Sequence, residues 1–307
     1  MTSHAPYHHG SRAVQDLVGV RELADHVGRS IGDGIRPVAA AFLELQPMLV
    51  IGGADGSDGS DGSGGAGGAV WASLLTGAPG FVRATGPNQI SIAGGLRRAD
   101  PLARALAEEG TPVGTIALDP RTRRRMRLNG RARPTPRGLA IEADQVFSNC
   151  PKYIQKRQLP PGAMPGRPSA PRHGVKLTGD QRAFLAEADT FFLATVHAEG
   201  ADASHRGGNP GFVRVTSPYT LEWDDFPGNS MFLSLGNLAT DPRAGLLFLD
   251  WVTGISLQLT GTARTEHGGD GTRTVRFTLT EAVQTLGASP WSWTSPEYSP
   301  ANPRQED

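Results

Sequence analysis

The chain has 307 residues with 30 basic and 30 acidic side chains, so its formal net charge is zero. That balance argues against a dedicated nucleic-acid binder and against a protein held on acidic membranes by bulk charge. The length suits two modest domains. Residues 37–51, an apolar-leaning stretch, are too short and too polar to span a bilayer, and residues 1–4 lack signal-peptide features. A single cysteine, Cys150, excludes an internal disulfide and is typical of the reducing cytoplasm, where we expect the protein to reside.

The first half of the chain predicts a small β-rich unit. Residues 1–36 form an N-terminal arm, whose Tyr7-His8-His9-Gly10 cluster favours a surface or terminal contact over a metal site. An amphipathic helix is expected over residues 37–45. Strands are expected at 48–51, 80–84, 113–118 and 126–132, with a helix starting at Asp100-Pro101. The low-complexity stretch 52–69 predicts a flexible loop, because its aspartates lack the spacing of a calcium loop.

The second half predicts the same order of elements after a linker at residues 160–177. Thr178 and Gln181 have the spacing of a capping box, which predicts a helix over residues 179–188. Strands are expected at 191–196, 211–215, 245–251 and 255–263, with a further helix at Asp241-Pro242. The tail, residues 295–307, is expected to be disordered.

An internal duplication explains this recurrence. GAPGFVR at residues 77–83 returns as GNPGFVR at 208–214, and Gly130-x-Ala132-Arg133 returns at the same offset as residues 261–264. Several matches in the same order indicate a tandem repeat. Many short strands in each copy predict a mainly β fold of two small antiparallel barrels, one at residues 37–159 and one at 178–294.

The two copies differ in their charges. Ser73-Leu74-Leu75 of the first copy aligns with Ser204-His205-Arg206 of the second, whereas the arginine-rich run 121–127 aligns with the neutral run 252–258. In a strand, Arg123, Arg125 and Arg127 would share one face. That face is either a solvated edge strand, which basic residues protect from aggregation, or part of an anion site.

Small polar residues gather at 227–237, which include Asn229, Ser230, Ser234 and Asn237. This segment is either an ordinary turn followed by a helix cap or a phosphate site at a helix entry. Together with His205-Arg206 in the same copy, the anion site is the better hypothesis. Cys150 is more typical of a structural thiol than of a nucleophile, and no motif of a zinc protease, redox dithiol, hydrolase elbow or P-loop occurs.

Several blocks resemble the pyridoxamine 5′-phosphate oxidase-like, FMN-binding split-barrel superfamily, above all its two-copy flavin-nucleotide-binding branch. They are SHRGGNPGF at 204–212, the 228–237 stretch and NCPKYI at 149–154. The resemblance implies six-stranded Greek-key split barrels that normally form a homodimer, with FMN at the interface. For this chain it implies an intrachain pseudo-dimer, and the leucines at 74–75 lead us to expect one flavin site per chain, because an apolar lining cannot stabilise a phosphate dianion.

Site residues follow from that resemblance. Arg206 is expected to bind the phosphate, with Ser234, Asn229 and Ser230 as hydrogen-bond donors, and Lys152 or Arg125 near the flavin ring. The strand at Val213-Arg214 would run along the ring. The full set of predicted cofactor-binding residues is Ser204, His205, Arg206, Gly207, Val213, Arg214, Asn229, Ser230, Ser234, Asn237, Arg125, Lys152, Tyr153 and Gln155. His205 is the one weak candidate for a catalytic group, and no metal is expected.

The resulting hypothesis is an FMN-dependent oxidoreductase that acts on a small organic substrate with oxygen or reduced nicotinamide as the redox partner. One alternative is a non-catalytic flavin-binding or flavin-storage protein. Another keeps the fold with haem or a deazaflavin as the ligand. The chain would work as a monomeric pseudo-dimer or as a homodimer, without nucleic-acid or membrane partners.

Overall fold

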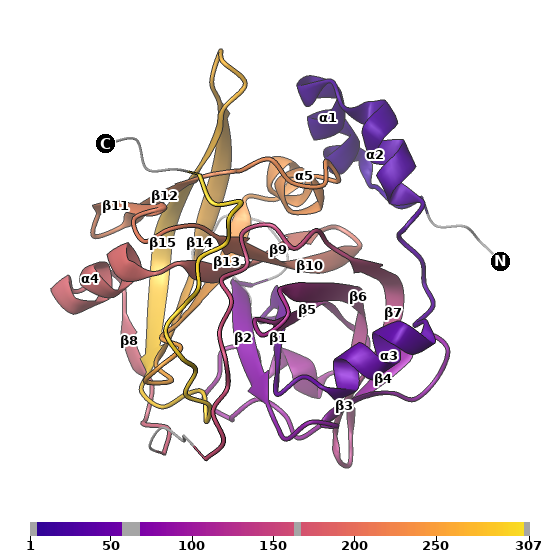
Figure 1. The fold of residues 1–307 in the computed structure, drawn as a ribbon, viewed down its shortest axis with the longest axis vertical. Helices are drawn as coiled ribbons and strands as arrows, with labels where there is room; N and C mark the ends of the chain where they lie inside the picture. The colour runs from indigo at the N-terminus through magenta and orange to yellow at the C-terminus, as the bar shows by residue number, and fades with distance from the viewer. Residues whose placement is uncertain (1–4, 57–67, 163–166, 304–307) are drawn as a thin grey trace.

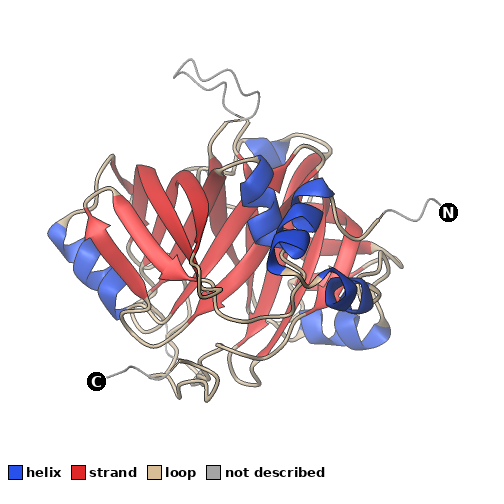
Figure 2. Ribbon diagram, turned by 90° about the horizontal axis from the view of Figure 1, so that it is seen from above, coloured by secondary structure: helices blue, strands red, loops and turns tan. Residues whose placement is uncertain are grey.

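Two antiparallel β-sheets dominate the computed structural model, which describes residues 5–56, 68–162 and 167–303 (Figure 1). The sheets lie side by side, and short helices cover their outer faces and ends (Figure 2). Within the part of the chain that the structure describes, none of the helices combines the length and the apolar character needed to traverse a bilayer.

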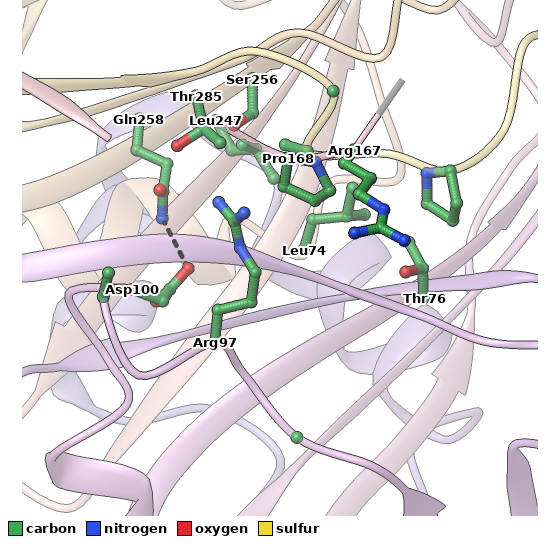
Figure 3. A pocket seen from close by; sticks show the side chains of 15 residues that line it. Leu74, Thr76, Arg97, Asp100, Arg167, Pro168, Leu247, Ser256, Gln258 and Thr285 are labelled. Carbon is green, nitrogen blue, oxygen red and sulfur yellow. Dashed lines mark hydrogen bonds between the residues drawn. The ribbon is translucent and has the colours of Figure 1, made fainter. Parts of the chain in front are cut away.

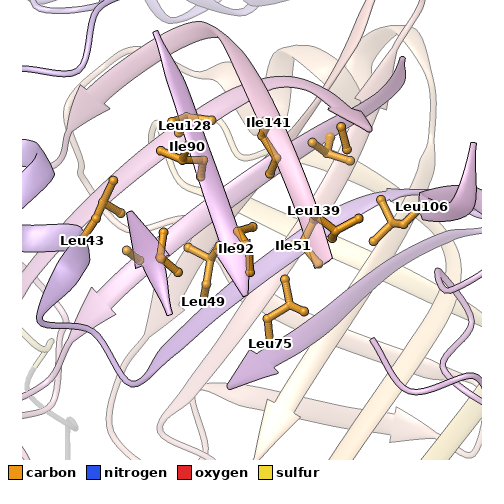
Figure 4. Close-up of a cluster of buried hydrophobic side chains, with 14 of the residues drawn as sticks. Leu43, Leu49, Ile51, Leu75, Ile90, Ile92, Leu106, Leu128, Leu139 and Ile141 are labelled. Carbon is orange, nitrogen blue, oxygen red and sulfur yellow. The ribbon is translucent and has the colours of Figure 1, made fainter. Parts of the chain in front are cut away.

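The first sheet curls around a core of its own. Its strands are β1 (Met48–Ala54), β2 (Val70–Thr76), β3 (Val82–Ala84), β4 (Gln89–Ala93), β5 (Thr111–Asp119), β6 (Arg124–Thr135) and β7 (Gly138–Ser148), in the spatial order β2-β1-β5-β6-β7-β4-β3. Every strand contributes to one buried apolar cluster, in which Leu49, Ile90, Leu128 and Ile141 converge (Figure 4). A single interior cluster shared by all strands is what a small barrel requires.

The second sheet repeats the first. Its strands are β9 (Thr190–His197), β10 (Gly200–Gly207), β11 (Val213–Ser217), β12 (Thr220–Asp224), β13 (Arg243–Leu249), β14 (Ser256–His267) and β15 (Arg273–Thr285), in the order β10-β9-β13-β14-β15-β12-β11. The pairing register repeats as well: Ile116 pairs with Val50 and Arg127, and Leu247 pairs with Phe192 and Gln258. The predicted duplication of β-barrels is confirmed, with seven strands in each repeat rather than six.

The helices predicted over residues 37–45 and 179–188 are confirmed, whereas the two helices of the N-terminal arm were not predicted. They are α1 (His9–Val18), α2 (Arg21–Gly28), α3 (Pro37–Glu44), α4 (Gly179–Glu187), α5 (Leu233–Thr240) and the 3₁₀ turn η1 (Ala105–Ala107). The capping box of α4 is present. The prediction that helices start at the Asp-Pro pairs is wrong. Asp241 instead follows α5 and accepts hydrogen bonds from the backbone N–H of Arg243, so the pair ends a helix and leads into β13.

The barrels pack directly on one another. A third apolar cluster joins them, with Val50, Ile116 and Leu118 from the first barrel and Phe192 and Leu247 from the second among its members. β10 lies against β5, and β13 lies against β2, so the contacts obey the internal pseudo-symmetry.

Two equivalent glycines allow this close approach. A Cβ at Gly114 would clash with the backbone of Asp202 and Ala203, and one at Gly245 would lie 2.5 Å from Trp71 Cα. Gly52 is similar, because its Cβ would lie 2.5 Å from that of Ala194. Gly52 belongs to β1, so the glycine-rich stretch begins as a strand and not as the flexible loop that was expected over residues 52–69. Most of that stretch, residues 57–67, lies outside the described residues.

The segments outside the barrels tie them together. Helix α1 lies on α5, as Figure 1 shows, and Tyr7 and Ala24 of the arm share an apolar cluster with Phe147 of β7 and Leu233 of α5. The linker contributes β8 (Arg172–Gly174), which pairs with β15.

The tail is another correction. Residues 295–303 are not disordered: the buried Gln155 accepts the backbone N–H of Ser299 at 2.8 Å, and Arg123 pairs with Glu297 at 3.0 Å. The sequence composition suggested disorder because the segment is polar, but its partners lie far away in the chain. Residues 304–307 lie outside the described residues.

Candidate functional site

A cluster of cationic side chains lies where β6 of the first barrel meets β10 of the second. Arg125 and Arg127 are two apart on β6, so they share a face and reach across the interface together. The Nη1 atom of Arg125 lies 2.8 Å from Nδ1 of His205, and Nη1 of Arg127 lies 3.1 and 3.2 Å from the two carboxylate oxygens of Asp202. Arg125 and Arg127 therefore share a face, as predicted, and it points into the barrel interface rather than into solvent. Arg123 does not join them: it precedes β6 with a left-handed backbone, φ 52°, and pairs with Glu297 of the tail.

Asp202 organises the interior side of the cluster. Its carboxylate accepts hydrogen bonds from Ser234 Oγ at 2.7 Å and from Asn129 Nδ2 at 3.3 Å, besides the ion pair with Arg127. Ser234 is also 3.0 Å from Ser204 Oγ, so the first turn of α5 is joined to β10. The sequence analysis did not select Asp202, although its position two residues before Ser204 places it on the same strand face.

Arg206 marks the outer side of the cluster. It pairs with Asp225 at 3.1 Å, and Arg273 of β15 pairs with the other oxygen of that carboxylate at the same distance. The Tyr153 hydroxyl donates to the carbonyl of Pro227 at 3.0 Å, which brings the segment after β7 to the same place. The Arg206 side chain keeps 21% of its surface exposed, so the cluster is open to solvent on this side.

The cluster carries more positive charge than its carboxylates balance. Burial, together with repulsion by Arg127 and Arg206, lowers the pKa of Arg125 to about 9. Burial also lowers the pKa of Arg127, and burial with the repulsion of the surrounding arginines holds the pKa of His205 well below its ordinary value. His205 is therefore neutral at pH 7.

Several buried donors of the cluster have no hydrogen-bond partner among the described residues. They are the Nε atoms of Arg125, Arg127 and Arg206 and the Nε2 atom of His205. Buried polar groups are normally hydrogen-bonded, so unsatisfied donors on neighbouring arginines and a histidine suit a ligand of opposite character. Since Arg125 has no carboxylate partner in the described part of the chain, an anion fits this site chemically.

The structure brings together six of the predicted residues: Ser204, His205, Arg206 and Ser234 of the second repeat with Arg125 and Tyr153 of the first. Gly207 lies at the same place, because a Cβ there would collide with the carbonyl oxygen of Tyr153. Asn229 and Ser230 belong to the loop before α5, where Ser230 has a left-handed backbone with φ of 60°. Lys152 is exposed beside Tyr153.

Other predicted residues have different partners. The Val213 side chain lies in the core of the second barrel, and Arg214 pairs with Asp224 at the edge of the sheet. Asn237 donates to Thr195 Oγ1 and contacts His8 of the arm, at 2.9 and 2.8 Å.

Gln155 is also engaged elsewhere: it accepts from the tail and donates to the carbonyl oxygens of Tyr153 and Gly208. Val213, Arg214, Asn237 and Gln155 thus make structural contacts with residues outside the arginine cluster.

The pseudo-equivalent position between the other pair of strands lacks the cations. The strand registers place Leu74 where the other cleft has His205, and Ser256 and Gln258 where it has Arg125 and Arg127. Gln258 donates to Ser73 Oγ at 3.0 Å, and Ser73 donates to Asp100 at 2.7 Å. The strand positions of one cleft therefore carry cationic side chains, and the equivalent strand positions of the other carry uncharged ones.

The structure is thus a pair of fused, pseudo-symmetric β-barrels with a polar, arginine-rich cluster at their interface. Residues 177–299 match the pyridoxamine 5′-phosphate oxidase family, which covers the second barrel. The second barrel is therefore similar to the pyridoxamine 5′-phosphate oxidase family, and the first barrel repeats its strand order. The comparison with curated proteins finds no match.

Solved structures similar to this chain correspond to about a third of its length. HupZ from Group A Streptococcus is 13% identical, covering 34% of this chain and 89% of its own, with a TM-score of 0.28. The FAD binding protein from Mycobacterium smegmatis is 15% identical, covering 38% and 98%, with a TM-score of 0.27. General Stress Protein 26 from Bacillus anthracis is 9% identical, covering 38% and 92%, with a TM-score of 0.27.

Proposed function

We propose that the chain binds one FMN in the cationic cleft, with the phosphate held by Arg206 and Arg125. The observation that carries this proposal is the buried Arg125 guanidinium, which faces two further arginines and has no carboxylate partner within the described residues. Desolvating a cation without a counterion is unfavourable, and a bound phosphate dianion removes that penalty. Arginine is suited to this task because its planar guanidinium donates in pairs to phosphate oxygens.

Asp202 positions the site rather than binding the ligand. Its negative charge would repel a phosphate, and its oxygens already accept from Arg127, Ser234 and Asn129. By fixing Arg127 and the first turn of α5, Asp202 holds the donors in place before a ligand arrives. Such preorganisation lowers the free-energy cost of binding.

His205 presents a hydrogen-bond donor to the cleft. An arginine can only donate, so the contact with Arg125 makes Nδ1 of His205 the acceptor and places the proton of the neutral ring on Nε2. That Nε2–H is buried and has no partner in the described part of the chain. We therefore assign His205 a donor role toward the bound nucleotide rather than the role of a general acid, since four nearby arginines oppose its protonation.

The bound FMN would make the protein an oxidoreductase for a small organic substrate, with oxygen or reduced nicotinamide as its redox partner. FMN supplies hydride and electron transfer, while the protein supplies binding, orientation and charge. Here the arginines would stabilise negative charge on the cofactor, and the superfamily match of the second barrel agrees with a flavin phosphate as the anion.

A visible spectrum of the purified protein, before and after incubation with FMN, tests the proposal. We expect the two absorption bands of an oxidised flavin in wild type and in Leu74→Ala, and their loss in Arg206→Ala. A Soret band would identify haem instead, and equal flavin content in wild type and Arg206→Ala would overturn the assignment. Flavin bands without turnover of any donor would favour the storage function.

A further inference from the structure

The second, pseudo-equivalent cleft contains a cavity of about 340 Å³ (Figure 3). It lies between the barrels. The first barrel lines it with β2 and the loop that contains Arg97 and Asp100, the second barrel lines it with β13, β14 and β15, and the linker contributes Arg167 and Pro168. Its volume is at the lower end of the range for small-molecule sites, which indicates a compact ligand.

One arginine reaches into this cavity. Figure 3 shows the Arg97 guanidinium between Asp100 and Leu74, with Arg167 at the other end beside Thr76. Neither guanidinium has an ion pair or a side-chain hydrogen bond within residues 5–56, 68–162 and 167–303. The sequence analysis expected an apolar cleft here because it considered strand positions alone, and these arginines come from loops.

Among the described residues that line the cavity, Asp100 is the one carboxylate, and both of its oxygens accept hydrogen bonds. Ser73 Oγ and the backbone N–H of Leu102 donate to one oxygen at 2.7 and 3.0 Å, and Gln258 donates to the other at 3.3 Å. Burial raises the pKa of Asp100, so the site carries at most one negative charge and that charge is held by fixed donors. Two arginines against one aspartate leave an excess of one positive charge, which matches a monoanion better than a phosphate dianion.

The rest of the lining suits an apolar body with a second polar group. Leu74, Leu247 and Pro168 form apolar walls. The hydroxyls of Ser256 and Thr285 have no hydrogen-bond partner in the part of the chain that the structure describes, and Figure 3 shows both above the cavity. Converging apolar walls, a cation and free hydroxyls are the usual constituents of a specific small-molecule site.

We propose that this cavity is a second ligand site, distinct from the cationic cleft, which binds a compact organic monocarboxylate through Arg97. In this cleft the positions equivalent to Arg125, Arg127 and His205 are occupied by Ser256, Gln258 and Leu74. Its strands therefore lack the cations that would hold a phosphate. The loop arginines then give it a weaker positive charge that suits a single carboxylate.

Titration calorimetry of the full chain with benzoate near neutral pH tests the proposal, with benzamide as the neutral isostere and inorganic phosphate as competitor. We expect saturable binding of benzoate, at least roughly tenfold weaker binding of benzamide, and no displacement by phosphate at equal concentration. Arg97→Gln is expected to weaken benzoate roughly tenfold, whereas Arg98→Gln, the exposed neighbour outside the cavity, leaves it unchanged.

Leu74→Trp provides a second variant, because a larger side chain fills the cavity without changing its charge. Loss of benzoate binding in this variant, with an unchanged circular dichroism spectrum, supports the proposal. Absence of saturable benzoate binding in wild type, equal affinity for benzamide, or equal effects of Arg97→Gln and Arg98→Gln would each overturn it. Because the probe is not a flavin, these results are independent of flavin content.

Discussion

Arg125 of the first barrel and His205 of the second are in contact, with 2.8 Å between Nη1 and Nδ1, although 80 residues separate them in the chain. The contact joins two side chains that the pseudo-symmetric position lacks, because Ser256 and Leu74 stand there instead. The fused barrels can therefore diverge at equivalent positions, which two identical subunits of a homodimer cannot do. That divergence is the basis for expecting one flavin site in each chain.

Asp202→Asn tests whether the buried ion pair supports the site. Arg127 would keep its charge without a counterion, so the free energy of unfolding should fall by about 3–5 kcal/mol. Asp224→Asn breaks the exposed pair with Arg214 and should cost less than about 1 kcal/mol. Urea denaturation of both variants measures the difference, and equal losses would show that the Arg127–Asp202 pair has no special role.

Gly114→Ala tests the packing of the two barrels. A methyl group there collides with the backbone of Asp202 and Ala203, so we expect a loss of about 1–3 kcal/mol and weaker contact between β5 and β10. Gly179→Ala, at the first residue of α4 with open space around it, is the control and should be neutral or slightly stabilising. Thermal unfolding followed by circular dichroism distinguishes them, and matching melting temperatures would argue against close barrel packing.

Acid should weaken the attachment of the N-terminal arm. The rings of His8 and His197 stack with centroids 4.5 Å apart, and burial lowers the pKa of both below the ordinary value of 6.5. The unfolded chain therefore binds more protons once the pH falls through 6.5, so stability is complete above that pH and is lost below it.

Urea midpoints measured between about pH 8 and pH 5 test this expectation. His197→Gln should flatten the decline below pH 6.5, because it removes one of the two stacked rings. His267→Gln, at an exposed position, should leave the decline as in wild type. A midpoint in wild type that rises on acidification would contradict the prediction.

Gln155→Ala tests the ordered tail. The substitution leaves the backbone N–H of Ser299 and the amide of Asn302 without their acceptor, so residues 295–303 should detach from the segment that follows β7. Limited proteolysis should then cleave the tail at least several-fold faster than in wild type. Gln158→Ala is the control, because that residue bonds Thr294, just before the tail, through its backbone N–H and C=O alone. Equal cleavage rates would show that the tail is held by other contacts.

Local signals predicted much of this fold. The spacing of Thr178 and Gln181 predicts α4, and the recurring GxPGFVR blocks predict the duplication, because both depend on near neighbours or on copies of the same sequence. The alternation of arginines also predicted the face that Arg125 and Arg127 share. The helix predicted at Asp241-Pro242 is wrong because proline fits both the first turn of a helix and the residues just after one.

Only part of the candidate site could be predicted from the sequence, and the reason is physical. Its contacts are made between repeats: Asp202 becomes important only because Arg127 lies across the interface, and Arg97 enters the second cleft from a loop. Gln155 was assigned to the cofactor because it belongs to the NCPKYIQ block, whereas in the structure it holds the tail. The pattern of residues within one strand does not indicate which residue of the other barrel will contact it.

The number of FMN molecules bound per chain tests the central claim most directly. Saturating the protein with FMN, removing the excess and measuring flavin absorbance against protein concentration should yield one FMN per chain in wild type and in Leu74→Ala. Arg125→Gln, which removes the unpaired buried cation, should retain almost none. Two FMN molecules per chain, or equal retention by wild type and Arg125→Gln, would contradict the account.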